Sequence, residues 1–229
     1  MPLDLMVECL HGEARQLTLR RPMLIMAGFA GRDQAKVQQH IDELVQEGVP
    51  APESVPTYYR VPEYLLVGPG EYDVVGERTS GEAEPVLVVT ESGVYVGVGS
   101  DHTDRDAERQ SVAMSKLLGP KVMGTTVWPV EDVKEYWDEL ILEGWSGGML
   151  YQRGVLADLL HYAAHPLERM RTAGRDLVLF LGTLPVIGGK LGFAAEFAGS
   201  LRDPRTSRSL SFAYRSAPQR QGQAERPTC

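Results

Sequence analysis

The strongest constraint on the fold comes from two short runs of residues with high β-propensity and a turn between them. The runs are Pro85–Thr90 and Val94–Gly99, and Glu91-Ser92-Gly93 separates them. Branched residues favour extended backbone, and a glycine in so short a connection is typical of a β-hairpin. The sequence therefore predicts two paired antiparallel strands, around which the rest of the chain is organised.

The register of this hairpin predicts a cluster of acidic side chains. If Ser92-Gly93 is a two-residue loop, Glu84 faces Asp101, and Glu82 shares their face because side chains alternate along a strand. Three converging carboxylates repel each other unless a cation lies between them. Oxygen ligands of this kind suit Mg²⁺, Mn²⁺ or Ca²⁺.

Two further observations bear on this cluster. Gly97 and Gly99 fall on the acidic face, where we expect them to leave room beside the carboxylates. The opposite face is apolar and predicts a core surface of Leu87, Val89, Val94, Val96 and Val98. Two alternatives stay open: the Glu-x-Glu sequence points to solvent on an edge strand, or a one-residue slip of the turn moves Asp101 to the other face.

Composition limits the classes of function. The chain has 229 residues, 43% of them hydrophobic, which is enough for a substantial core. Its net charge of −8 argues against a general nucleic-acid binder, because neutralising phosphates needs clustered Lys and Arg. Cys9 and Cys229 are too few for a disulfide framework. Without a recognisable signal peptide or a long apolar run, we expect a cytoplasmic protein with no membrane partner.

The order of the segments predicts one main domain with two appendages. Residues 1–21 favour a small N-terminal strand or hairpin extension, and residues 22–214 form the main domain. Within it, Asp33 is placed to cap a helix over Gln34–Glu47. Residues 215–229 are polar and rich in Pro, Gly and Gln, which predicts a disordered tail.

One constellation of residues resembles a known metal site. Glu82-Ala83-Glu84 is followed by Ser100-Asp101-His102-Thr103-Asp104-Arg105-Asp106. The fumarylacetoacetate hydrolase superfamily carries Glu-x-Glu on one strand and Asn-Asp-x-Ser/Thr-x-Arg-Asp at the end of a later one; here Ser100 replaces the Asn. The resemblance implies Glu82, Glu84 and Asp101 as metal ligands, with Mg²⁺ the expected ion. It also implies a β-dominated α+β domain, a mixed β-sandwich roll with short flanking helices, and a homodimer.

The resemblance also implies a catalytic dyad. Family hydrolases carry His-x-x-Glu just after the first buried strand, where the pair orients and deprotonates the attacking water. His40 and Glu43 have this spacing and are neighbours on a helix surface. Lys36 and Val37 stand where the family usually has Asn-Tyr. The alternative is a polar pair that simply faces solvent.

Three more segments match the family in order. Tyr58 and Arg60 lie in a Pro-rich segment that lines the substrate cleft of family enzymes. Lys121 fits a Lys-x-x-x-Thr-x-x-Pro stretch whose Lys points into the active site, and Lys116 is the competing register. Thr183 fits the Gly-Thr segment that holds a substrate carboxylate.

The resemblance therefore implies a divalent-metal-dependent enzyme that acts on a small anionic oxo-acid. The expected reaction is C–C bond hydrolysis of an acylpyruvate-type or diketo-acid substrate through a stabilised enolate. Lys121 and Arg105 would supply positive charge, although Arg105 could instead brace Asp101. Decarboxylation, isomerisation and hydration pass through the same kind of enolate and stay open. So does a metabolite-binding protein without catalysis.

Overall fold

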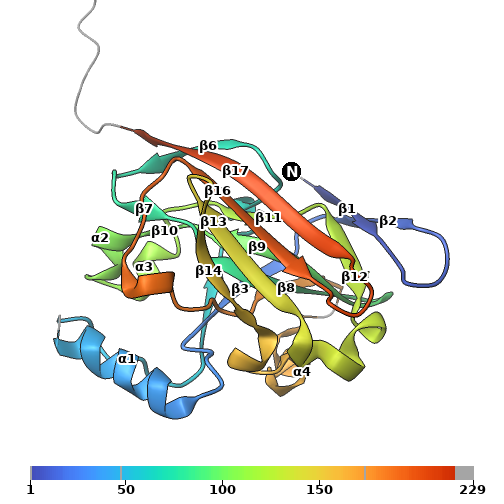
Figure 1. Cartoon of the computed structure of the whole chain (residues 1–229), viewed down its shortest axis with the longest axis horizontal. Coiled ribbons are helices and arrows are strands. Elements are labelled where there is room, and N and C mark those ends of the chain that lie inside the picture. Colours follow the sequence, from blue (N-terminus) through green and yellow to red (C-terminus); the bar gives the residue numbers. More distant parts are fainter. Residues whose placement is uncertain (1, 47, 173, 220–229) are drawn as a thin grey trace, which may run out of the picture.

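The computed structural model of the chain describes residues 2–46, 48–172 and 174–219, and strands dominate this part (Figure 1). The largest sheet formed by these residues has ten strands. Eight of them follow one another in the order β2 (Arg15–Leu19), β1 (Leu3–Val7), β12 (Thr126–Pro129), β9 (Gly93–Asp101), β8 (Ala83–Thr90), β15 (Leu177–Phe180), β3 (Met23–Gly28) and β4 (Thr57–Val61). In addition, β11 (Lys121–Met123) pairs with β9, and β5 (Leu66–Val67) pairs with β11.

A second sheet of five strands packs against the first. Its order is β14 (Met149–Val155), β13 (Ile141–Ser146), β16 (Glu196–Arg202), β17 (Ser209–Gln219) and β6 (Glu71–Val75). The short strands β7 (Thr79–Ser80) and β10 (Thr103–Asp104) form a separate pair. Parallel pairs, such as β3 with β15, occur beside antiparallel ones, so the sheets are mixed as expected.

Helices occupy the connections. The four α-helices of the described residues are α1 (Gln34–Gln46), α2 (Arg105–Glu108), α3 (Val112–Ser115) and α4 (Leu167–Met170). Single turns of 3₁₀ helix form at Glu63–Leu65, Val130–Asp132, Leu156–Asp158, Tyr162–Ala164 and Ile187–Gly189, and a longer one at Lys134–Glu139. Asp33 caps α1 as predicted, because its Oδ1 accepts a hydrogen bond from Ala35 N at 3.1 Å. None of these helices is long and apolar enough to cross a membrane.

Alternation along the strands divides the interior into two cores. In β8, Val86 and Val88 face the inside of the curled ten-stranded sheet, whereas Leu87 and Val89 face the five-stranded sheet. All four side chains are at most 4% exposed. A strand buried on both faces carries apolar residues at nearly every position, which explains the unbroken apolar run of β8.

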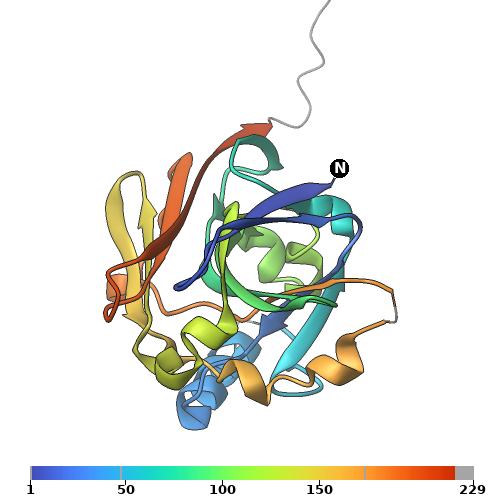
Figure 2. The same ribbon diagram turned by 90° about the vertical axis from the view of Figure 1, so that its right-hand side faces the viewer.

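The short helices close one end of the curled sheet. In Figure 1, α2 and α3 lie at the end opposite the β1–β2 hairpin, and in Figure 2 they lie within the outline of the curl. Strand β9 leads directly into β10 and α2. The last residue of β9, Asp101, therefore lies at this closed end.

The N-terminal hairpin forms as predicted, whereas the predicted tail is partly wrong. Strands β1 and β2 pair antiparallel, and β1 also pairs parallel with β12. Residues 215–219 belong to β17, where Arg215 pairs with Glu71 of β6 and with Glu196 of β16. Backbone pairing does not depend on apolar side chains, so the polar composition of this segment misled the prediction. Residues 220–229 lie outside the described residues.

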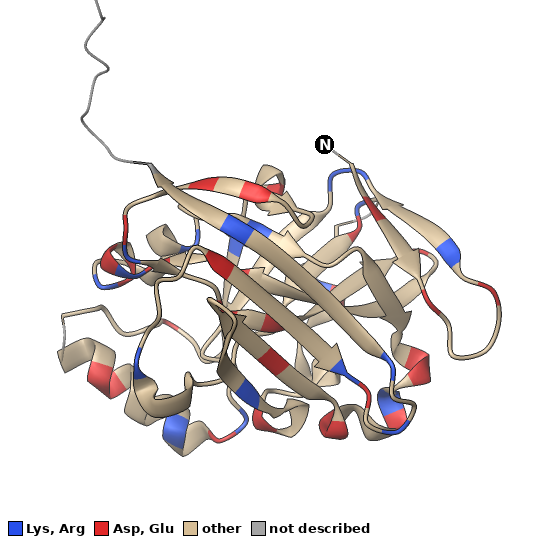
Figure 3. Cartoon of the chain, turned by 45° about the horizontal axis from the view of Figure 1, so that its top comes forward, with Lys and Arg blue, Asp and Glu red and all other residues tan. Residues whose placement is uncertain are grey.

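The outer face of the five-stranded sheet carries charges of both signs. Figure 3 shows Lys or Arg next to Asp or Glu on neighbouring strands. Arg215 lies 3.7 Å from Glu196, and Arg153 lies 3.3 Å from Glu143. This face therefore has no uniform charge, and such exposed pairs contribute little to stability.

Candidate metal centre

The β8–β9 hairpin positions the three predicted carboxylates, but in a register that differs from the predicted one by two residues. Glu84 pairs with Gly99 and not with Asp101. Asp101 instead lies opposite Glu82, whose carbonyl accepts a hydrogen bond from Asp101 N at 3.1 Å. Because side chains alternate, a shift of two residues leaves every side chain on its predicted face. The predicted clustering of the three carboxylates is therefore correct although the predicted register is wrong.

The turn explains the shift. The loop consists of Glu91 and Ser92, and Thr90 pairs with Gly93. Ser92 N donates to Thr90 Oγ1 at 3.1 Å, which closes the turn one residue earlier than predicted. Gly93 has φ of +143°, a conformation that other residues rarely adopt. Gly93 therefore provides the unusual backbone conformation at the start of β9 and is not part of the two-residue loop.

Glu82, Glu84 and Asp101 converge at the closed end of the curled sheet. Each offers one carboxylate oxygen, and these oxygens all lie within 4.8 Å of one another. The residues are 9%, 2% and 0% exposed respectively. The only cations that contact the Asp101 oxygens among the described residues are the ammonium groups of Lys116 and Lys121. An all-oxygen set of three carboxylates fits Mg²⁺ or Mn²⁺.

The glycines of β9 do not leave open space beside these carboxylates, so that expectation is wrong. A Cβ on Gly99 would lie 2.5 Å from Val122 O and 2.8 Å from Phe180 Cε1. A Cβ on Gly97 would lie 2.7 Å from Met123 Cε. The two glycines instead allow β11 and neighbouring side chains to pack against β9.

Arg105 braces one of the carboxylates. Its Nη1 donates to Glu82 Oε1 at 2.9 Å and to Glu108 Oε2 at 2.9 Å, and its Nε donates to Ser80 Oγ at 2.8 Å. The residue is 7% exposed. With these partners Arg105 holds Glu82 in place, and its contact with substrate stays a prediction. Of the two roles considered from the sequence, the brace is present, but the residue braced is Glu82 and not Asp101.

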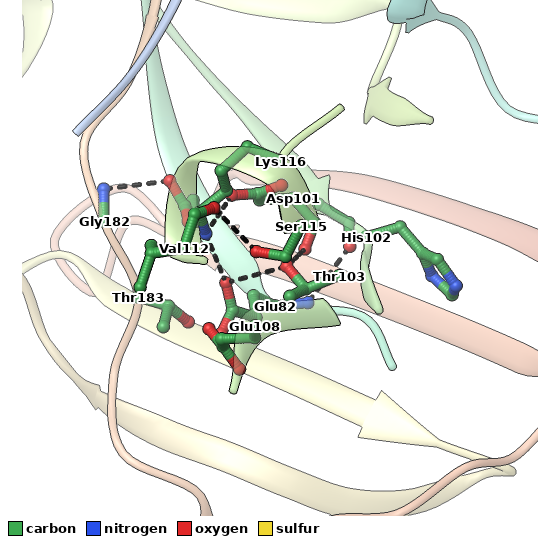
Figure 4. A network of polar contacts seen from close by, with 12 residues as sticks. Glu82, Asp101, His102, Thr103, Glu108, Val112, Ser115, Lys116, Gly182 and Thr183 are labelled. Atoms are coloured by element: carbon green, nitrogen blue, oxygen red, sulfur yellow. Dashed lines mark hydrogen bonds and ion pairs between the residues drawn. The ribbon is translucent and has the colours of Figure 1, made fainter. Parts of the chain in front are cut away.

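Two lysines converge on Asp101. Lys121 Nζ lies 2.7 Å from Asp101 Oδ1 and donates to His102 O at 3.0 Å, and Lys121 is fully buried. Lys116 Nζ makes an ion pair with Asp101 Oδ2 and donates to Glu82 Oε2 at 3.3 Å (Figure 4). Burial lowers the pKa of Lys121. Burial alone would also lower the pKa of Lys116, but the charges of Asp101 and Glu82 raise it well above its usual value.

The carboxylates themselves are shifted in opposite directions. Burial alone would raise the pKa of Glu82, but Lys116 and Arg105 outweigh burial and lower it to about 2. Burial raises the pKa of Glu84 well above its usual value, and the neighbouring charge of Asp101 raises it further. A bound cation would act in the opposite direction and favour the ionised form of Glu84.

The loop after β15 is tied to the carboxylate strand. Gly182 N donates to Glu84 Oε2 at 2.9 Å, and Thr183 Oγ1 donates to Ala83 O at 2.8 Å. Gln152 Nε2 donates to Thr183 Oγ1 at 2.7 Å, and its Oε1 accepts from Ala83 N at 3.0 Å. The structure therefore places Thr183 beside the strand that carries Glu84, and its role in holding a substrate carboxylate stays a prediction. Its hydroxyl, however, already serves to hold the strand.

The structure does not bring the predicted dyad to the carboxylates. His40 Nδ1 lies 3.9 Å from Glu43 Oε2 on α1, and the two side chains are 62% and 59% exposed. In Figures 1 and 2, α1 lies apart from α2 and α3, which cover the carboxylates. The role of His40 and Glu43 in catalysis stays a prediction, because it requires α1 to approach the site.

The tyrosines of β4 divide between the two faces of the strand. Tyr58 Oη lies 3.0 Å from His165 Nδ1, and Arg60 is exposed on the same face. Tyr59 points to the inside of the curled sheet, and the charges of Lys116 and Glu108 act on its pKa, which burial raises. Tyr59 is therefore the β4 side chain on the carboxylate side. The predicted cleft residues Tyr58 and Arg60 lie on the other face.

Two residues beside the carboxylates, Gln152 and His102, were not singled out from the sequence. Gln152 is 1% exposed in β14, and nothing in its neighbouring sequence marks it. His102 is buried beside Asp101, with Nδ1 2.7 Å from Tyr214 Oη, and burial lowers its pKa to about 4. Its place in the Ser-Asp-His-Thr sequence could have suggested proximity to the site but not its partner.

Similarity to known proteins extends over most of the chain. Residues 27–214 match the family described as "Protein of unknown function (DUF2848)". The chain belongs to this family. No curated protein matches its sequence.

Solved structures share the fold. Fumarylpyruvate hydrolase from Pseudomonas aeruginosa, in complex with Mn²⁺ and pyruvate, matches 95% of this chain over 97% of its own, with a TM-score of 0.64 and 17% identity. A 5-carboxymethyl-2-hydroxymuconate delta-isomerase from Mycobacterium smegmatis matches 90% of this chain over 81% of its own (TM-score 0.58, 17% identity). The yeast fumarylacetoacetate hydrolase family protein ynq8 matches 88% of this chain over 95% of its own, with a TM-score of 0.58 and 15% identity. This DUF2848 protein therefore has the fumarylacetoacetate hydrolase fold, as predicted.

Proposed function

We propose that this DUF2848 protein is a divalent-metal-dependent enzyme that acts on a small oxo-acid. The observation that carries the proposal is the convergence of Glu82, Glu84 and Asp101 within 4.8 Å at a buried end of the sheet. A structure with the same fold holds Mn²⁺ and pyruvate. Mg²⁺ and Mn²⁺ both suit the oxygen ligands, and we expect Mg²⁺ as the ion in the cell.

The residues of the site have separate tasks in this proposal. When bound, the cation would act as a Lewis acid toward the oxygens of a 2-oxo-carboxylate and stabilise negative charge that develops there. Arg105 holds Glu82 in place, and Gly182 N holds Glu84. Lys121 lies against Asp101, and burial lowers its pKa, so it is the candidate for giving or taking a proton.

Two classes of reaction fit these residues. C–C bond hydrolysis requires a base that activates water, and His40–Glu43 is the candidate if α1 moves toward the carboxylates. Decarboxylation or isomerisation requires no such base. The exposed position of His40 and Glu43 favours this second class. A protein that binds a metabolite without turnover is the third outcome that the experiment must separate.

The test is turnover by the purified full-length chain with Mg²⁺ or Mn²⁺. Acylpyruvates, oxaloacetate and unsaturated oxo-acids form the substrate panel, and product analysis separates hydrolysis from decarboxylation and isomerisation. Glu84→Gln, which removes one ligand, is the inactive control. Turnover that persists in EDTA and in Glu84→Gln would contradict the proposed metal-dependent chemistry. Saturable binding without turnover of any member would favour the metabolite-binding protein.

We also propose that the protein works as a homodimer in the cytoplasm. The dimer rests on the family resemblance, and the cytoplasmic location rests on the composition of the sequence. Sedimentation equilibrium of the full-length chain tests the dimer, and a monomer at micromolar concentration would contradict it.

A further inference from the structure

Lys116 stands where a cation would bind among the carboxylates. Its Nζ contacts Asp101 Oδ2 and Glu82 Oε2, which belong to two of the three candidate metal ligands. Only 8% of the side chain is exposed. The ammonium is thus the chain's own positive charge inside the acidic cluster (Figure 4).

An ammonium at this place excludes a metal from the same oxygens. Mg²⁺ and Mn²⁺ bind carboxylate oxygens at about 2.0–2.2 Å. The Lys116 Nζ lies 3.3 Å from Glu82 Oε2 and closer still to Asp101 Oδ2. A metal bonded to these two oxygens on the side that Nζ occupies would lie almost in contact with it, where two like charges with little solvent between them repel strongly. Lys116 and the metal therefore compete for this side of the carboxylates.

The two lysines of the site differ in how they are held. Lys121 belongs to β11, where it pairs directly with Asp101 of β9, and its ammonium also binds a backbone carbonyl. Lys116 follows the four-residue helix α3 and lies between Met114 and Leu117, which are 54% and 39% exposed. The backbone of Lys116 belongs to no sheet, so its side chain can leave the carboxylates with less disturbance of the core than that of Lys121, which is fixed in β11.

We propose that Lys116 is a built-in competitor of the divalent metal, whose ammonium must leave Glu82 and Asp101 when the metal binds. The inference rests on the metal site of the proposed function. It assigns to Lys116 control over metal affinity, a role that differs from the proton transfer proposed for Lys121. Metal-free protein keeps the acidic cluster neutralised by Lys116, and metal-loaded protein presents the ammonium outside the cluster.

The first experiment measures metal affinity. Calorimetric titration of Mn²⁺ into wild type and Lys116→Met should give a Kd that is about tenfold or more lower for the variant. Lys134→Met removes the same charge from an exposed position and should leave the Kd within about twofold of wild type. Equal affinity of wild type and Lys116→Met would overturn the competition but leave the metal-dependent function intact. No Mn²⁺ binding by either protein would overturn both.

The second experiment uses wild-type protein and decides the question even if Lys116→Met fails to fold. Reductive methylation followed by mass spectrometry reports which lysines are accessible. Without metal, Lys116 and Lys121 should be protected and the exposed Lys36 should react. Saturating Mn²⁺ should make Lys116 reactive and leave Lys121 protected. Protection of Lys116 that is unchanged by bound Mn²⁺ would overturn the inference.

Discussion

The ion pairs of Glu82 make the stability of the metal-free protein depend on pH by an amount that follows from the structure. Its pKa is lowered from 4.5 to about 2, and each pH unit corresponds to about 1.4 kcal/mol. This lowering corresponds to a stabilisation of about 3.5 kcal/mol at neutral pH. Because the folded-state pKa is the lower one, this stability is complete above pH 4.5 and is lost as pH falls through about 2.

Glu82→Gln removes the charge and keeps the size of the side chain. The free energy of unfolding of the variant should be about 3.5 kcal/mol lower than that of wild type near pH 7, and about 1.4 kcal/mol lower near pH 3. Urea unfolding in EDTA over this pH range measures the difference. Glu13→Gln, at an exposed loop position, controls for the loss of one carboxylate. A difference that stays constant with pH would refute the reasoning.

Three further predictions concern other residues of the site. Glu84→Gln should raise the free energy of unfolding of the metal-free protein at neutral pH, because burial raises the pKa of this carboxyl. The same variant should lose the stabilisation that Mn²⁺ gives to wild type. Thermal unfolding with and without Mn²⁺ measures both effects. Gln152→Leu should cost about 1–3 kcal/mol, measured by urea unfolding, because Ala83 N loses its buried acceptor. His40→Ala should lower hydrolytic turnover by about two to four orders of magnitude without changing Mn²⁺ affinity. Unchanged turnover would remove His40 from the mechanism.

The carboxylate cluster was predictable because it depends only on alternation along two strands. The predicted hairpin had the wrong loop, yet Glu84 and Asp101 kept their faces because the error was two residues and not one. Apolar alternation likewise predicted the core surface around Leu87. These features follow from local sequence, which fixes the direction of each side chain once a strand is given.

The partners of the carboxylates were less predictable. Lys116 and Lys121 both reach Asp101, whereas sequence matching treated them as alternatives. Gln152 reaches the site from the other sheet, and no local pattern encodes such a contact. Tyr59 and not Tyr58 faces the inside of the curled sheet, because the face of β4 depends on how that strand packs. Contacts between distant elements are set by the packing of the sheets, which a single sequence does not show.

The most direct test of the account is anomalous diffraction from crystals of the full-length chain soaked in Mn²⁺. We predict one anomalous peak bonded to oxygens of Glu82, Glu84 and Asp101, with the ammonium of Lys116 moved away from Glu82 and Asp101. Crystals at saturating Mn²⁺ that show no peak at these carboxylates, with Lys116 still paired to Asp101, would contradict the account.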